Sequence, residues 1–153
     1  MHPTLITSKA HQWPLSDYIA LMQSLPKDQF QWIVTGVESD RAYLQPLLDL
    51  DCINTVGQLT LDELITFMTA CDGIVAGSTG PLHLAAALGL HALGLYQSNP
   101  EVYQRWAPLG QHAEVLHSTI PCQGERKLAT CPCILAIPPE QVKAIILTWF
   151  DAK

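Results

Sequence analysis

Two hydroxyls and an imidazole lie close together in the segment "GSTGPLHLAAALG", residues 77–89, and these side chains suit the binding of an anion. Ser78 and Thr79 offer hydroxyl donors, and the His83 imidazole follows one helical turn later. Pro81 fits the first position of a helix, where no N–H is needed. The N–H groups and positive dipole end of a helix start attract anions such as phosphate. From these residues alone, an anion site and an ordinary helix cap with a structural histidine stay equally open.

This segment differs from two common phosphate-binding loops. It contains no Gly-Lys-Ser/Thr, so it is not a Walker loop. The run G-S-T-G also lacks the third glycine of the dinucleotide-binding fingerprint.

A strand followed by a helix is expected to position the segment, because the apolar run 73–77 leads into it. Elsewhere, short apolar runs alternate with stretches of helical period, and Thr60 with Glu63 forms a capping box. The expected strands are 31–36, 52–57, 73–77, 91–96 and 113–117, and the expected helices are 14–25, 39–50, 60–71, 81–89 and 138–150. Apolar strands between helices indicate a parallel sheet covered on both faces. We predict a doubly wound, mainly parallel α/β fold.

The composition describes an ordinary globular domain. The chain has 153 residues, 48% of them hydrophobic, and a net charge of −6, which argues against a nucleic-acid partner. No apolar stretch approaches the roughly 20 residues that span a bilayer, and the N-terminus shows no signal-peptide pattern. Five cysteines are an odd number that fits reduced thiols, so we expect a cytoplasmic protein.

The same segment and its surroundings resemble glycosyltransferase family 9, the ADP-heptose:lipopolysaccharide heptosyltransferases. That family carries Asp-Thr-Gly-(Pro/Leu)-x-His-x-x-Ala-Ala in the C-terminal half of a two-domain GT-B fold. Further likenesses appear in the same order along the chain, up to about Gly110. They are "HP" (2–3), "HQWP" (11–14), "TGVESD" (35–40), "GQLTLDEL" (57–64) and "ALGLYQSNPEVYQRWAPLG" (92–110).

The resemblance implies contacts with a nucleotide-diphospho-sugar donor, with ADP-heptose as the expected donor. Thr79, Gly80 and His83 fall where the family holds the diphosphate and sugar. Glu38 falls where the family contacts the nucleoside through its ribose, and Leu59 falls near the adenine wall. A helix start with hydroxyl and imidazole donors would also stabilise the charge that develops on a diphosphate leaving group.

Two positions depart from the family pattern. Ser78 replaces the family's aspartate, so a carboxylate contact to the donor sugar is lost. His11 stands where the family has lysine, so a cation for the phosphates is missing or weakened, and Lys9 is a candidate substitute. The identity of the donor sugar is therefore open.

The resemblance covers the second domain of a GT-B enzyme, so residues 1–153 are expected to form one nucleotide-sugar-binding domain. The N-terminal domain, which holds the glycolipid acceptor and supplies the catalytic base, is absent from this chain. The domain would bind the donor for synthesis of lipopolysaccharide core or a related glycan. The full-length enzyme would associate peripherally with the cytoplasmic face of the inner membrane.

Three cysteines, Cys122, Cys131 and Cys133, raise the question of a metal. A structural zinc site takes four ligands in paired spacings, and the only close pair here is C-x-C. A fourth ligand would have to come from His112 or His117. We therefore predict free thiols, no metal site and no cofactor.

Two other functions share the predicted architecture. One is half of a sugar-nucleotide epimerase, which would need carboxylates at the cleft. The other is a non-catalytic, flavodoxin-like nucleotide-binding domain, which would need acids after the first strand. The expected first strand end, "TLITSK", has none. Transfer of a sugar fits the hydroxyl, imidazole and single Glu38 better.

Overall fold

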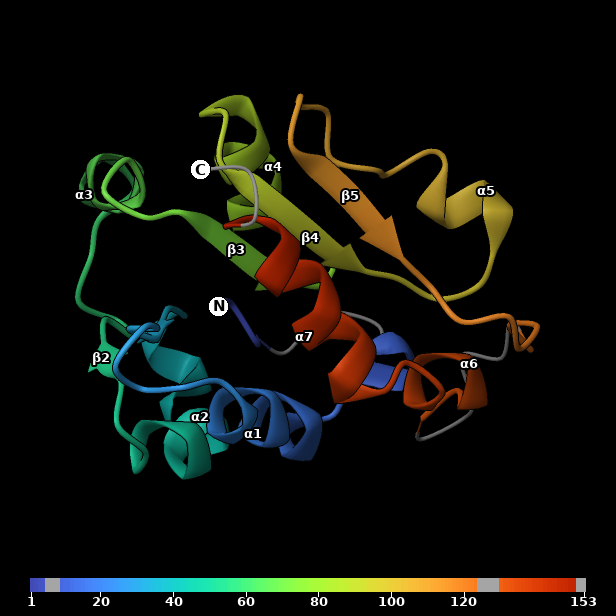
Figure 1. Cartoon of the computed structure of the whole chain (residues 1–153), viewed down its shortest axis with the longest axis horizontal. Helices are drawn as coiled ribbons and strands as arrows, with labels where there is room; N and C mark the ends of the chain where they lie inside the picture. The colour runs from blue at the N-terminus through green and yellow to red at the C-terminus, as the bar shows by residue number, and fades with distance from the viewer. Residues whose placement is uncertain (5–8, 124–129, 151–153) are drawn as a thin grey trace.

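The computed structural model describes residues 1–4, 9–123 and 130–150. Five parallel strands lie between two layers of helices (Figure 1). The strands are β1 (Ile33–Val34), β2 (Ile53–Asn54), β3 (Gly73–Ala76), β4 (His91–Leu95) and β5 (Ala113–Leu116). The α-helices are α1 (Leu15–Ser24), α2 (Arg41–Leu48), α3 (Leu61–Met68), α4 (Gly80–Ala87), α5 (Pro100–Tyr103), α6 (Pro132–Leu135) and α7 (Pro139–Thr148).

The N-terminal segment, residues 1–4, joins two groups of strands into one sheet. β1 pairs with β2, and β3, β4 and β5 pair in that order, all parallel. The Met1 ammonium donates to Ile33 O at 2.7 Å, and Thr35 N donates to Met1 O at 3.1 Å. On the other side, His2 forms a parallel bridge with Ala76. The sheet order is therefore β2, β1, the N-terminal segment, β3, β4 and β5, which confirms the predicted doubly wound fold.

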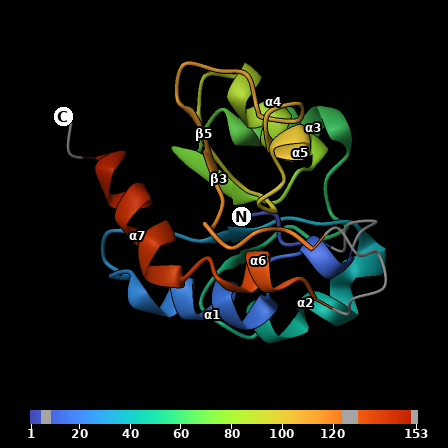
Figure 2. The same ribbon diagram turned by 90° about the vertical axis from the view of Figure 1, so that its right-hand side faces the viewer.

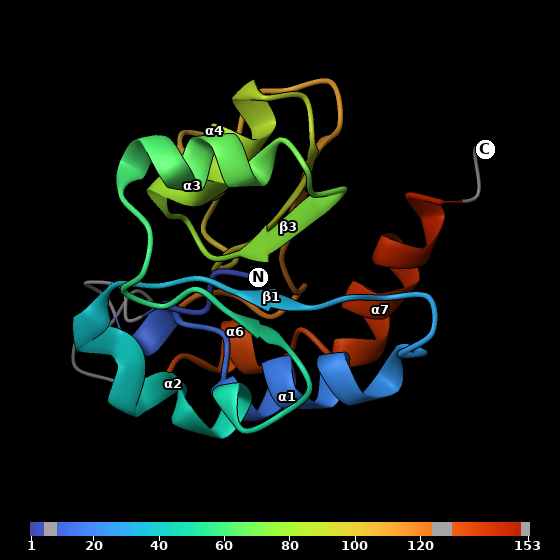
Figure 3. The ribbon, with the colours of Figure 1, turned by 90° about the vertical axis from the view of Figure 1, so that its left-hand side faces the viewer.

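Each face of the sheet has its own core, because successive strand residues point to opposite faces. Val75, Leu93 and Leu95 pack on the side covered by α1, α2, α6 and α7. Ile74 and Ala76 pack on the side covered by α3, α4 and α5 (Figures 2 and 3). Among the described residues, no helix combines the length and apolar character needed to cross a membrane.

The strand-to-helix transition predicted for residues 77–89 is confirmed. β3 ends at Ala76 and α4 begins at Gly80. The helix lies close to the sheet because Gly94 leaves room: a Cβ there would come within 2.9 Å of Leu82. α4 stops before Gly89, whose φ of +80° is the left-handed conformation that terminates helices.

Several element bounds differ from the predictions. β1 and β2 have two residues each instead of six, although the hydrogen bonds from Thr55 N to Val34 O and from Gly57 N to Gly36 O continue the pairing beyond them. The predicted helix 39–50 starts as a 3-10 turn, Glu38–Asp40, and α2 then begins at Arg41 without a side-chain cap. The reason is that Asp40 already has helical angles (φ −86°, ψ −11°) instead of the extended conformation of an N-cap.

Candidate functional site

The sheet order reverses between the N-terminal segment and β3, and this point is where doubly wound sheets bind ligands. From the N-terminal segment the chain continues to α1 on one face, and from β3 it continues to α4 on the other. A crevice is therefore expected outside the carboxyl ends of these two strands. The site residues predicted from the sequence follow the N-terminal segment, β1, β2 and β3, so they all belong to this edge of the sheet.

The start of α4 leaves its hydroxyl donors uncommitted to capping. Thr79 occupies the N-cap position in an extended conformation, but its hydroxyl donates to Gly77 O at 3.3 Å and makes no capping bond. Pro81 has no N–H to donate. A Cβ built on Gly80 meets nothing within 4 Å, so the space beside the helix start is open. His83 is half-buried one turn into the helix, and its backbone N–H donates to Thr79 O at 3.4 Å.

Ser78 is exposed and is held toward the next strand by Tyr96, directly after β4. Burial raises the pKa of Tyr96, and a hydrogen bond from Ser78 opposes that rise. The Tyr96 hydroxyl in turn donates to the carbonyl of Trp106. Tyr96 was not among the predicted site residues, although it stands at the end of the predicted strand 91–96.

Glu38 follows β1 and forms a two-pronged ion pair with Arg41. Arg41 Nε lies 2.6 Å from Glu38 Oε1, and Arg41 Nη2 lies 2.7 Å from Oε2. Arg41 also donates to Val56 O at 2.6 Å, which ties the pair to the end of β2. This hydrogen bonding holds the pKa of Glu38 below its usual range, so the carboxylate stays charged at neutral pH. Arg41 was not predicted, although its spacing of three residues from Glu38 is typical of such pairs.

The loop after β2 approaches Glu38 closely and carries Leu59. Gly57 has a φ of +69°, and a Cβ there would lie 2.1 Å from Glu38 Oε2. Leu59 is half-buried in this loop, directly before the capping box of Thr60 and Glu63 that starts α3. The structure thus brings Glu38 and the Leu59 loop together, as a nucleoside site at this edge would require.

His11 lies in a 3-10 turn, Lys9–His11, after the N-terminal segment. Its Nε2 atom lies 3.5 Å from Cys122 Sγ, so the imidazole contacts the loop after β5. Burial lowers the pKa of His11, which favours the neutral imidazole. The Lys9 side chain and residues 5–8 lie outside the part of the chain that the structure describes, as does most of the "TLITSK" segment.

The two histidines considered as partners for the loop cysteines lie elsewhere. His112 is tilted against His91, with ring centroids 4.9 Å apart. His117 stacks on Tyr103 at 4.1 Å and places Nδ1 3.0 Å from Ser118 O. The histidine that reaches the cysteines is His11 instead.

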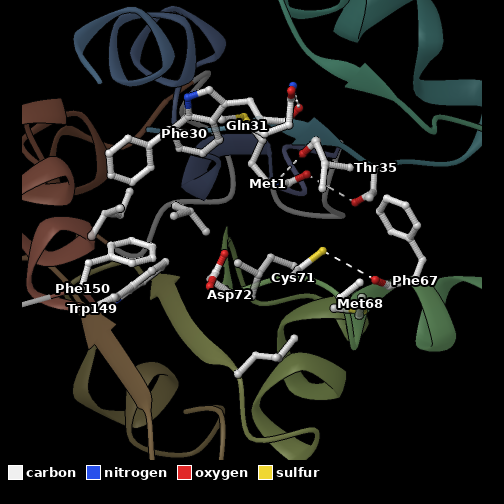
Figure 4. Close-up of a pocket in the computed structure, with 18 of the residues that line it drawn as sticks. Met1, Phe30, Gln31, Thr35, Phe67, Met68, Cys71, Asp72, Trp149 and Phe150 are labelled. Atoms are coloured by element: carbon white, nitrogen blue, oxygen red, sulfur yellow. Dashed lines mark hydrogen bonds between the residues drawn. The ribbon is translucent and has the colours of Figure 1, made fainter. Parts of the chain in front are cut away.

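A cavity of about 380 Å³ opens away from these residues (Figure 4). It lies between β1 and β3 beside Met1, and Phe67, Asp72, Trp149 and Phe150 are among its lining. None of the described residues predicted to bind a donor lines it. The cavity therefore does not coincide with the site predicted from the sequence.

The strand order and the open helix start at its switch point define a doubly wound α/β domain of the kind found in GT-B enzymes. Residues 2–133 match glycosyltransferase family 9 (heptosyltransferase), and the chain belongs to this family. It is 30% identical over 115 residues to lipopolysaccharide heptosyltransferase 2 of Escherichia coli strain K12. This alignment covers 70% of the chain and 32% of that relative.

Solved structures show the same fold. The structure of E. coli ADP-heptose LPS heptosyltransferase II has a TM-score of 0.80 and 26% identity, covering 97% of this chain and 44% of that one. E. coli heptosyltransferase WaaC with ADP has a TM-score of 0.74 at 16% identity, covering 97% of this chain and 43% of that one. The chain spans about a third of the length of the curated relative.

Proposed function

We propose that this chain binds the nucleotide-diphospho-sugar donor of a heptosyltransferase-type glycosyltransferase, with ADP-heptose as the donor. The observation that carries the proposal is the open start of α4 at the switch point of the sheet. The helix start and His83 supply donors where a diphosphate would lie, and Thr79 Oγ1 becomes a further donor when its proton turns from Gly77 O to the phosphate. The charged Glu38 at the end of β1 supplies an acceptor for ribose hydroxyls.

The nucleotide is inferred from two sources. Relatives in the same family include an enzyme described as an ADP-heptose LPS heptosyltransferase and a structure described as containing ADP. In this chain, the Leu59 loop lies against Glu38 and offers an apolar wall for a base. These contacts do not specify the identity of the donor sugar, because Ser78 stands at the family's aspartate position and hydrogen bonds to Tyr96.

Transfer needs an acceptor and a catalytic base, which we assign to a separate N-terminal domain. In that arrangement, residues 1–153 contribute donor binding and stabilise the departing diphosphate. The acceptor would be a glycolipid of the lipopolysaccharide core or a related glycan. The complete enzyme would work in the cytoplasm, at the inner face of the membrane that holds this acceptor. No observation favours the epimerase or flavodoxin-like alternatives.

Calorimetric titration of the chain with ADP, GDP and UDP tests the donor proposal. We expect ADP to bind and the other two to bind more weakly, because the Leu59 wall would contact the base, whereas Glu38 would contact the ribose that all three nucleotides share. Competition between ADP-heptose and ADP-glucose then tests the sugar. Absence of ADP binding, or equal affinity for all three nucleotides, would contradict the proposal.

A further inference from the structure

Three metal-ligating side chains meet where the N-terminal turn contacts the loop between β5 and α6, and a fourth, Cys133, lies beside one of them. His11 Nε2, Cys122 Sγ and Cys131 Sγ all lie within 4.8 Å of one another. Cys131 and Cys133 are fully buried, and their sulfurs lie 3.0 Å apart. All of these residues belong to the described part of the chain, and the three cysteines are free thiols there.

The spacing of these atoms fits tetrahedral zinc. Zn–S bonds of about 2.3 Å and Zn–N bonds of about 2.0–2.1 Å give tetrahedral edges of roughly 3.8 Å between sulfurs and roughly 3.6 Å between sulfur and nitrogen. The distance from Cys122 Sγ to Cys131 Sγ is 3.9 Å, and that from Cys122 Sγ to His11 Nε2 is 3.5 Å. We propose that His11, Cys122, Cys131 and Cys133 form a Cys₃His zinc site.

The edge between Cys131 and Cys133 must lengthen, and the Cys133 sulfur must also approach His11 or Cys122, because it is outside the group of ligand atoms that lie within 4.8 Å of one another. At 3.0 Å it is longer than a disulfide bond of about 2.05 Å and shorter than a tetrahedral edge. Cys133 lies in the first turn of α6, two residues after Cys131.

The two buried thiols differ in how readily they ionise, and only the lowered pKa of Cys131 favours the thiolate that binds a metal. Burial raises the pKa of Cys131, but hydrogen bonds from Cys133, Gln123 and Cys122 outweigh it and lower the pKa overall. Burial chiefly raises the pKa of Cys133 to about 12, so its thiol proton must be released to solvent when the metal binds.

Four protein ligands leave no open position for water, so the site is structural and not catalytic. It links position 11 to positions 122–133, where Cys131 N already donates to Ala10 O at 2.6 Å. Trp13 Nε1 donates to Ile137 O at 2.9 Å in the same region. The metal would fix the turn Lys9–His11, which follows the N-terminal segment at the switch point. It also gives a role to the histidine that replaces the family's lysine, so His11 is assigned to the metal and not to the donor phosphates.

Metal analysis of the chain, purified under reducing conditions without chelator, tests this site. We expect one zinc per chain, and a lower unfolding temperature after the zinc is removed with a chelator. Replacing zinc by Co²⁺ should give thiolate-to-cobalt charge-transfer bands and the visible bands of a tetrahedral ion. Substoichiometric zinc together with a Co²⁺ spectrum lacking charge-transfer bands would overturn the proposal.

Variants assign the ligands. Cys122→Ser and His11→Ala change half-buried positions, and each should lose most of the bound zinc and weaken the Co²⁺ bands. Cys52→Ser is the matched control, because Cys52 is also half-buried but donates to Leu47 O and is not among the proposed ligands. Equal metal content in Cys122→Ser and Cys52→Ser would overturn the assignment. A Cys131–Cys133 disulfide in the freshly purified reduced protein, detected by thiol alkylation and mass spectrometry, would do the same.

Discussion

Removing the hydroxyl of Thr79, at the start of α4, tests whether this turn binds a ligand or only begins a helix. The hydroxyl contacts Gly77 O and does not cap the helix. For Thr79→Val we therefore expect ADP affinity to fall by about 1.5–3 kcal/mol, the range for a hydrogen bond to a charged group. The free energy of unfolding should fall by only about 0.5–1.5 kcal/mol, for one neutral hydrogen bond. Calorimetric titration and urea unfolding measure the two losses.

Thr66→Val is the matched control for this variant. The Thr66 hydroxyl also donates to a backbone carbonyl, Asp62 O at 2.9 Å, but it lies in α3, outside the proposed site. It should lose a similar amount of stability and keep its affinity for ADP. If Thr79→Val binds ADP as tightly as Thr66→Val does, the turn is a helix start with no ligand role.

Glu38 is expected to recognise the nucleoside and not the phosphates. In Glu38→Gln, Arg41 keeps its bond to Val56 O, so the loops after β1 and β2 should stay in place. ADP should bind several-fold more weakly, because a charged acceptor for ribose is lost, and pyrophosphate should bind unchanged. Arg41 holds the pKa of Glu38 below its usual range. The wild-type protein should therefore keep its preference for ADP over pyrophosphate as the pH falls to the usual pKa range of a glutamate. Glu140→Gln on α7 is the control variant. If Glu38→Gln lost affinity for ADP and for pyrophosphate equally, relative to this control, the result would contradict this role.

Among the helices, α3 owes its start to a capping box that the sequence predicted and the structure confirms. Thr60 Oγ1 accepts from Glu63 N at 3.3 Å, and Glu63 Oε2 accepts from Thr60 N at 2.8 Å. Thr60→Ala should lower the free energy of unfolding by about 1 kcal/mol, because it leaves helix N–H groups unpaired. Thr69→Ala, at the other end of α3, should cost less, and chemical unfolding of both variants measures the difference. Equal losses would mean that the cap does not stabilise the helix.

The elements that were predicted well are those defined by local pattern. β3, α4 and the capping box of α3 follow from apolar runs, glycines and caps that adjacent residues specify. The strand formed by the N-terminal segment and the shortness of β1 and β2 depend on which distant backbone pairs with them. Likewise, position along the chain places Glu38 at the sheet edge, but only the fold brings Arg41 to Val56 and His11 to Cys122.

At the scale of the whole molecule, the sheet is continuous only because the N-terminal segment fills its centre. The Met1 ammonium and Met1 O pair with Ile33 and Thr35, and His2 N donates to Val75 O at 3.1 Å. The His2 imidazole is also bonded there, with Nδ1 2.7 Å from Thr35 Oγ1. A titratable side chain therefore lies at the junction of the two strand groups, beside the proposed crevice.

The stability of this junction should depend on pH through His2. Burial, and then repulsion from the N-terminal ammonium, lower the pKa of His2 from 6.5 to about 4. Between these two pKa values the unfolded chain binds the proton more readily than the folded chain does. The contribution of neutral His2 to the free energy of unfolding is therefore complete above pH 6.5 and is lost as the pH falls toward 4. The full difference corresponds to about 3 kcal/mol in the free energy of unfolding. Urea unfolding between pH 4 and 7 should show this slope together with that of the Met1 amino group, whose pKa burial lowers from 8.0 to about 6. His2→Gln should reduce the slope below pH 6, and the exposed His112→Gln should retain it. A His2→Gln variant with the wild-type slope would show that protonation of His2 does not oppose closure of the sheet.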